Sequence, residues 1–213
     1  NIFLGLEVDF IKDEWEDLNY FREKFDLDYI IGSVHLISNF QRQKRWFIDG
    51  PLVESFDQGL QDCFDGDIQA GVTAYYQHIK AMIRDQKPEV VGHLDKIRMH
   101  NQYRYFQDHE DWYLSLQEDV LQEIKRQKTI VEVNTRGLYK KRTDDLFPAD
   151  GLLRRIYEME IPITLSSDAH RPEELDKDFD FAMQQLNKIG FTSLMQLTAH
   201  GWKAVAGSPK VAY

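Results

Sequence analysis

Two kinds of apolar pattern alternate along this chain of 213 residues. Short runs of β-branched and aromatic residues predict strands, and most are continuously apolar, as is typical of parallel strands buried on both faces. These runs cover residues 2–8, 29–34, 90–94, 130–134, 163–167 and 192–197. Stretches with apolar residues spaced by three and four predict helices at 15–25, 68–84, 112–126, 151–159 and 178–189. This alternation predicts an α/β fold with a parallel sheet.

Three segments show where the pattern is regular and where it is not. In the stretch 112–126, one stripe is apolar and the opposite side is charged, which predicts a helix that covers the sheet. The helix at 15–25 is preceded by Asp13, with Glu16 three residues on, as in a capping box. The segment 39–67, rich in Gln, Arg and Asp, is the least regular. It is either an active-site loop or an ordinary solvated connection.

Composition narrows the class of protein. One domain over residues 1–213 is expected from the length, and 42% hydrophobic residues exclude a disordered chain. No apolar run approaches the ~18 to 20 residues that span a bilayer, so we expect no membrane partner. The 26 basic against 36 acidic residues give a net charge of -10, which opposes binding to nucleic acid.

The cysteine content and the first residues bear on the cellular compartment and on whether the sequence begins upstream. Cys63 is the only cysteine, so the chain can form neither an internal disulfide nor a thiolate zinc site. With no secretory leader visible, the prediction is a cytoplasmic protein. Asn1 directly precedes the predicted strand at 2–8, with no polar lead-in before it, so we expect further residues upstream.

Unusual polar residues follow five predicted strands in turn, each at the point where the strand ends. In a parallel sheet or barrel these ends share one edge, where ligand sites are built, so we expect the side chains to converge. They are Glu7, His35, His93, Asn134, and the pair Asp168 and His170. Three imidazoles and two carboxylates without a thiolate suit Zn, Mn or Fe ions.

Other site chemistries fit less well. Ser33, Ser166 and Ser167 lie beside these residues, but the chain has no Gly-x-Ser-x-Gly motif to present a nucleophilic serine. Its glycines near the strand ends are isolated, so neither a Walker loop nor a dinucleotide-binding loop is expected. A metal site is therefore the favoured interpretation.

At these residues the sequence resembles the polymerase and histidinol phosphatase (PHP) superfamily, most closely its histidinol-phosphatase branch. The matching motifs, in family order, are GLEVD at 5–9, IGSVH at 31–35, VGHLD at 91–95, EVNTRGL at 132–138 and SDAH at 167–170. The family's opening His-x-His motif has no counterpart here. The resemblance implies a distorted (β/α)7 TIM-like barrel whose N-terminal strands are absent from this sequence.

The resemblance also implies a site and an activity. It implies two or three divalent metal ions (Zn, Mn or Fe). Glu7 would bridge two of them, His35 and His93 would complete the second, Asp168 would bind the first and His170 the third. The implied reaction is hydrolysis of a small-molecule phosphate ester, L-histidinol phosphate, in histidine biosynthesis.

Substrate contacts are predicted at Ser33, Arg136 and Arg171. Either arginine could bind a phosphate through a bidentate fork, although a surface salt bridge is an equally good interpretation. Two alternatives stay open: a PHP-type protein-tyrosine phosphatase or general phosphoesterase, and a degenerate PHP domain without catalysis.

Overall fold

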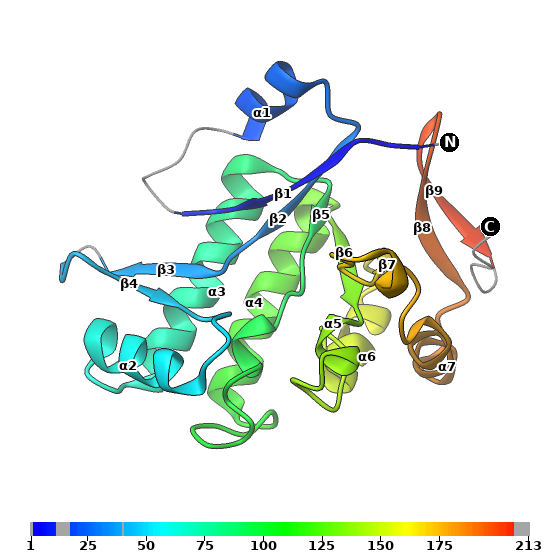
Figure 1. Ribbon diagram of the computed structural model, residues 1–213. Helices are drawn as coiled ribbons and strands as arrows, with labels where there is room; N and C mark the ends of the chain where they lie inside the picture. Colours follow the sequence, from blue (N-terminus) through cyan, green and yellow to red (C-terminus); the bar gives the residue numbers. More distant parts are fainter. Residues whose placement is uncertain (1, 12–17, 40, 207–213) are drawn as a thin grey trace.

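A parallel β-sheet forms the centre of the computed structural model, which describes residues 2–11, 18–39 and 41–206 (Figure 1). Its strands are β1 (Gly5–Asp9), β2 (Tyr29–Ser33), β5 (Val90–Val91), β6 (Ile130–Asn134) and β7 (Ile163–Ser166), adjacent in that order. All four pairings are parallel. The order in space therefore follows the order along the chain, as in the wall of a (β/α) barrel. Within the described residues, β1 and β7 are the two edges of this sheet.

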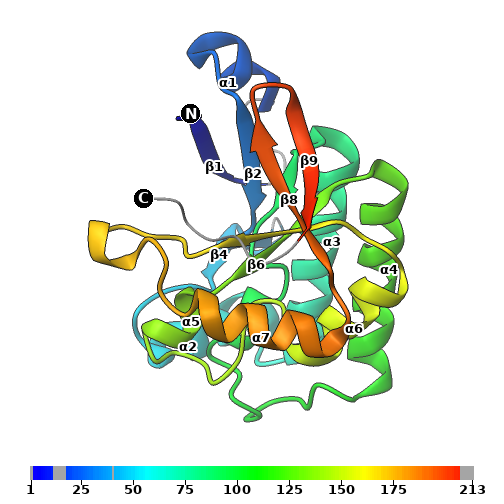
Figure 2. The same cartoon turned by 90° about the vertical axis from the view of Figure 1, so that its right-hand side faces the viewer.

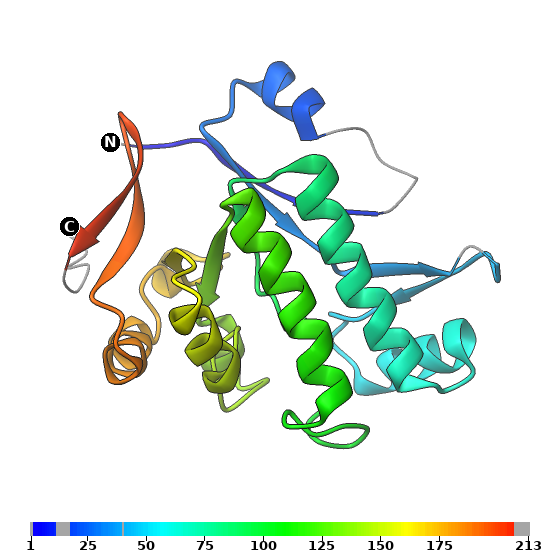
Figure 3. The ribbon, with the colours of Figure 1, turned by 180° about the vertical axis from the view of Figure 1, so that it is seen from behind.

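Helices follow the strands, as the periodicity predicts. They are α1 (Leu18–Phe25), α3 (Ile68–Gln86), α4 (Asp111–Gln127), α6 (Asp150–Glu158) and α7 (Phe179–Ile189). Seen from behind, α3 and α4 lie side by side across the sheet (Figure 3). Asp67 caps the start of α3 by accepting a hydrogen bond from the Ala70 N–H at 3.0 Å. The predicted capping box at Asp13 and Glu16 lies outside the described residues.

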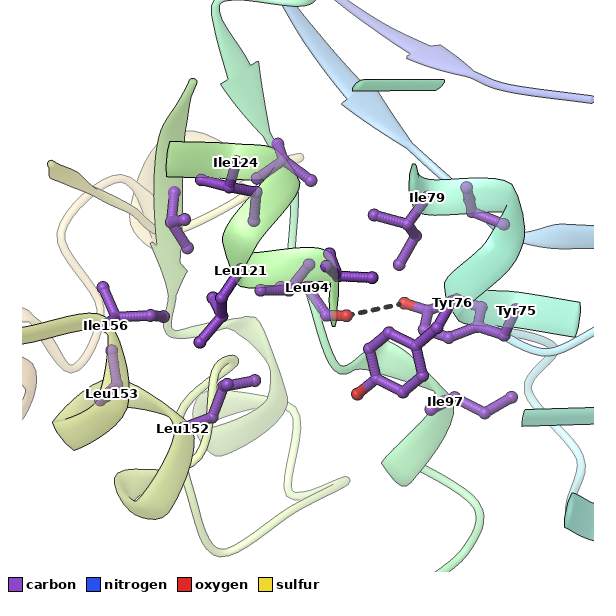
Figure 4. Packing of buried hydrophobic residues seen from close by; sticks show 14 of the residues in the cluster. Tyr75, Tyr76, Ile79, Leu94, Ile97, Leu121, Ile124, Leu152, Leu153 and Ile156 are labelled. Carbon is purple, nitrogen blue, oxygen red and sulfur yellow. Dashed lines mark hydrogen bonds between the residues drawn. The ribbon is translucent and has the colours of Figure 1, made fainter. Parts of the chain in front are cut away.

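The core lies between these helices and the sheet (Figure 4). Leu121 and Ile124 from α4 face Ile156 from α6 and the residues that follow β5. The hydroxyl of Tyr75 donates to the Leu94 carbonyl at 3.3 Å, which ties α3 to the segment carrying His93. A buried tyrosine hydroxyl needs such a partner. The helical stripes predicted from the sequence are thus the faces that bury this core.

The segment 39–67 is far more ordered than its composition indicates. It completes a hairpin of β3 (Leu36–Asn39) and β4 (Lys44–Phe47) and continues into α2 (Val53–Phe64). Trp46 is 0% exposed and donates from Nε1 to the Phe56 carbonyl at 2.8 Å. Gly59 and Gly71 leave room for its ring, since a Cβ at either would lie within 2.6 Å of it. A single buried tryptophan in a short strand gives no periodicity, which is why the pattern missed this unit.

A second hairpin and three short helical turns complete the described chain. The strand predicted near 192–197 is present as β8 (Ser193–Thr198), but it pairs antiparallel with β9 (Gly201–Ala206) in a separate hairpin beside β7 (Figure 2). Short helical turns follow three strands of the main sheet: η1 (Lys96–Arg98), α5 (Arg136–Tyr139) and η2 (Pro172–Glu174). In the described ranges, no helix has the length and apolar content needed to cross a bilayer.

Candidate metal centre

Three of the predicted side chains converge at the C-terminal edge of the sheet. Glu7 lies on β1, His35 follows β2 and His93 follows β5. The two histidine Nε2 atoms are 3.1 Å apart, and Glu7 Oε1 lies 3.2 Å from Nε2 of His93 and 3.9 Å from Nε2 of His35. We call these three residues the triad. All three ligand atoms lie within 4.8 Å of one another.

The triad has the dimensions of a metal site. Ligand atoms bound tetrahedrally at ~2.0 to 2.1 Å from one ion lie roughly 3.3 Å from each other, close to the separations seen here. His93 is 2% exposed, and its Nδ1 is buried without a hydrogen-bond partner. Its Nε2, by contrast, faces the other two ligand atoms. Two imidazoles and a carboxylate suit Zn, Mn or Fe, which fits the predicted donor set.

Neighbouring side chains hold each triad member in place. Ser33 Oγ donates to Glu7 Oε1 at 2.7 Å. Asp9 Oδ1 accepts from the His35 backbone N–H at 2.8 Å and lies 3.5 Å from its Nδ1. Carboxylates and hydroxyls in these positions orient metal ligands and fix the histidine tautomer. Ser33, predicted to contact substrate, is 1% exposed and serves Glu7 in this structure.

The same contacts set the charges. Burial opposes ionisation of Glu7, but hydrogen bonds from His93 and Ser33 and the nearby imidazoles outweigh it and hold its pKa far below the usual value. Burial acts against a charged His35 too, yet the carboxylates of Asp9 and Glu7 raise its pKa. Glu7 is therefore held in its ionised form, which suits the binding of a cation.

Asp168 and His170 lie outside the triad. Among the described residues, neither contributes an atom to the group of converging ligands. A hydrogen-bond path connects Asp168 to His93: Asn134 Nδ2 lies 3.5 Å from Asp168 Oδ2 and 3.2 Å from Glu132 Oε2, and Glu132 accepts from the His93 N–H. The His170 side chain is 65% exposed. The five predicted metal ligands are thus divided into a group of three and a neighbouring pair.

The two predicted phosphate-binding arginines also differ. Nη1 of Arg136 lies 2.6 Å from the Asp168 carbonyl oxygen, 2.9 Å from Nδ1 of His170 and 3.2 Å from the Tyr139 hydroxyl. Arg136 is therefore already engaged in holding the Asp168–His170 segment. Arg171 is exposed on an extended stretch of backbone.

Sequence reasoning missed three carboxylates around the triad. Glu132 is a buried acid in an otherwise apolar strand, which is an anomaly that the sequence does display. Asp9 faces the same side of β1 as Glu7, two residues away, so strand alternation could also have found it. Asp49 follows the β3–β4 hairpin and lies 3.6 Å from Nε2 of His35. Only the folded hairpin brings it there.

Comparisons with known proteins give a consistent picture. The PHP domain family model matches residues 1–136. Curated proteins named "Probable histidinol-phosphatase" from Schizosaccharomyces pombe and Deinococcus radiodurans are each 27% identical, over 92% and 89% of this chain. The chain spans 62% and 65% of their respective lengths.

Solved structures share the fold. The putative histidinol phosphatase hisK from Listeria monocytogenes superposes with a TM-score of 0.69 at 18% identity, over 84% of this chain and 67% of that one. Histidinol phosphate phosphatase from Lactococcus lactis, complexed with Zn, L-histidinol and phosphate, gives 0.60 at 17% identity, over 94% and 71%. These likenesses confirm the predicted α/β fold of the PHP type.

Proposed function

The chain belongs to the PHP domain family, and from that premise we propose that it is a metal-dependent phosphatase acting on L-histidinol phosphate, with L-histidinol and phosphate as products. The convergence of Glu7, His35 and His93 into a metal-sized triad is the observation that carries this proposal. The names of the curated relatives support the substrate. The proposal treats residues 1–213 as one domain in the cytoplasm, consistent with Cys63 being a free, buried thiol.

The triad would hold one divalent ion, and Asp168 and His170 would serve one or two further ions. Zn, Mn and Fe all suit these donors. When bound, such ions supply Lewis acidity to a water molecule and to the phosphoryl oxygens. The protein's own part is positional: Asp9 orients His35 and Ser33 orients Glu7. Fixed orientation of ligands is what keeps the reacting groups in line.

Substrate recognition would rest on fixed cations near the triad. A protein of net charge -10 repels an anionic ester at long range, so local positive groups must hold the phosphate. Of the predicted contacts, Arg171 is exposed and accessible, whereas Arg136 would have to release His170 to reach a substrate.

Phosphate release tests the proposal. The full chain is stripped with a chelator, and Mn or Zn is added back with L-histidinol phosphate or a phosphotyrosine peptide as substrate. We expect metal-dependent release with preference for L-histidinol phosphate. Preference for the peptide would instead support a PHP-type tyrosine phosphatase. No release from either ester, at any metal loading, would contradict phosphatase activity in this chain.

A further inference from the structure

Two cations flank a single carboxylate beside the triad. Asp49 Oδ1 lies 3.4 Å from Nζ of Lys96 and 3.6 Å from Nη1 of Arg142. Its other oxygen, Oδ2, lies 3.6 Å from Nε2 of His35. One carboxylate group therefore separates the two cations from the metal-facing nitrogen of His35.

The fold brings these groups together from three separate segments. The Ile48 N–H donates to the His35 carbonyl at 3.0 Å, which continues the β3–β4 hairpin and places Asp49 next to His35. Lys96 begins η1, and its N–H donates to the His93 carbonyl at 2.9 Å. Lys96 is thus fixed by its own backbone hydrogen bond to His93, and Asp49 by the backbone hydrogen bond that its neighbour Ile48 makes to His35.

Lys96 is poorly paired for a buried charge. Its side chain is 3% exposed, and Asp49 is its one acidic partner within 4 Å in the described part of the chain. Their separation of 3.4 Å exceeds the ~2.7 to 2.9 Å of a good charge-assisted hydrogen bond. Asp49 Oδ1 is itself buried without a hydrogen bond. The other contact of the ammonium group is with the Phe147 ring, whose centroid lies 5.3 Å from Nζ. One long ion pair and one cation–π contact compensate a buried charge only in part, which indicates a role other than stabilising the fold.

Arg142 is the accessible member of this group. It is 36% exposed and has Asp49 as its one acidic partner within 4 Å among the described residues. It also lines a cavity of about 530 Å³ between the segments that follow β5 and β6. The cavity lining includes neither Lys96 nor a triad residue and carries three aspartates, so of the two cations beside Asp49 it exposes Arg142 alone. The guanidinium group of Arg142 presents several N–H donors to an anion.

We propose that Lys96 and Arg142 bind the phosphate group of the substrate, and that Asp49 is the internal counter-ion that holds both cations next to the triad. This inference rests on the proposed function. The Asp49 carboxylate is itself an anion that lies between these two cations and His35, so it occupies a position that suits a phosphate group. A phosphate bound to the same cations competes with Asp49 for them. Lys96 and Arg142 therefore raise the affinity for phosphate, and Asp49 lowers it.

Binding of inorganic phosphate to the zinc-loaded full chain tests this, measured by isothermal titration calorimetry at saturating zinc. Lys96→Met should weaken phosphate binding roughly 10-fold or more, the usual loss for a hydrogen bond to a charged group. Asp49→Asn should tighten it, and Lys96→Arg should largely restore it. Lys80→Met is the matched control, because Lys80 pairs with Asp119 on α4 and should leave phosphate affinity unchanged.

Failure of this inference can be distinguished from failure of the proposed function. Zinc affinity is measured in the same variants and should stay within about twofold of the parent in Lys96→Met and Lys96→Arg, which keep every triad residue. Asp49→Asn removes a carboxylate 3.6 Å from Nε2 of His35, so its phosphate affinity is compared only at saturating zinc. Unchanged phosphate affinity in Lys96→Met, or weaker binding in Asp49→Asn, would overturn the inference even if L-histidinol phosphate is hydrolysed. Opposite shifts in the two variants without any hydrolysis would support the anion site and reject the proposed function.

Discussion

The buried carboxylate of Glu132 accepts a hydrogen bond from the backbone N–H of His93 at 2.7 Å. Glu132 lies on β6 and His93 lies two residues after β5, so a side chain of one strand holds the triad histidine that follows the neighbouring strand. Desolvation raises the pKa of Glu132, and the charge of Glu7 adds to this. Burying this carboxyl group costs free energy, and its hydrogen bond to the His93 backbone explains why an acid stands there.

Replacing Glu132 should therefore weaken metal binding more than it weakens the fold. We expect Glu132→Ala to lower zinc affinity about 10-fold to 100-fold, the usual effect of removing a group that orients a ligand. Glu123→Ala is the matched control, because Glu123 is equally buried but is bonded to Arg126 and Gln127 on α4. Zinc titration against a chromophoric chelator measures both. Equal losses in the two variants would show that Glu132 acts only through stability.

Gly92 is predicted to be irreplaceable beside the triad. A Cβ there would lie 2.4 Å from Ser33 Oγ and 3.1 Å from Cγ2 of Ile31. Gly92→Ala should displace Ser33 from Glu7 and destabilise the fold by about 1 to 3 kcal/mol through overpacking. Gly151→Ala on α6 has no atom within 4 Å and should be neutral or stabilising by up to ~1 kcal/mol. Urea unfolding of both variants checks this, and equal stability of the two would contradict it.

The position of Asp49 depends on the hairpin that Trp46 anchors. Trp46→Ala removes a fully buried ring and its hydrogen bond to Phe56, and should cost about 3 to 5 kcal/mol in the free energy of unfolding. Phe47→Ala on the same strand is the control, because Phe47 is 48% exposed. Chemical denaturation of both proteins gives the comparison. A loss below about 1 kcal/mol for Trp46→Ala would mean that the hairpin is not held by this ring.

Asp57 should contribute stability that depends on pH. Arg104 donates to the Asp57 carboxylate and, against some desolvation, lowers its pKa, with help from Tyr105. A carboxyl whose pKa is lowered by folding stabilises the protein above its unfolded pKa of ~3.9, and this contribution is lost as pH falls through the folded value. Asp57→Asn should cost about 0.2 to 1 kcal/mol at pH 7 and less at pH 3. Unfolding free energies at the two pH values test it; the same cost at both would exclude a charge effect.

The sheet and its helices could be predicted because the strands are continuous apolar runs and the helices carry an unbroken apolar stripe. The strand at 130–134 has the predicted bounds, and the helices at 68–84 and 112–126 extend only one or two residues further. The hairpin around Trp46 could not be predicted in this way, because it is stabilised by one side chain that packs against α2 and α3 and not by a repeating pattern of apolar residues.

Only those site residues that lie at or near the ends of neighbouring parallel strands could be placed together from the sequence. Glu7, His35 and His93 were placed together correctly because neighbouring parallel strands share an edge. Asp168 and His170 lie outside the triad, and the chain turns there, since Asp168 adopts a left-handed backbone with φ of 51°. Asp49 is brought in by a tertiary contact that no local pattern records.

Metal binding by the triad is tested most directly by counting zinc ions and their affinity in the parent chain, His93→Ala and His200→Ala. His200 is exposed at the turn between β8 and β9, so it serves as the control. We expect His93→Ala to lose one tightly bound ion while its far-ultraviolet circular dichroism stays unchanged, and His200→Ala to match the parent. An unchanged zinc count and affinity in His93→Ala would contradict a metal centre at Glu7, His35 and His93.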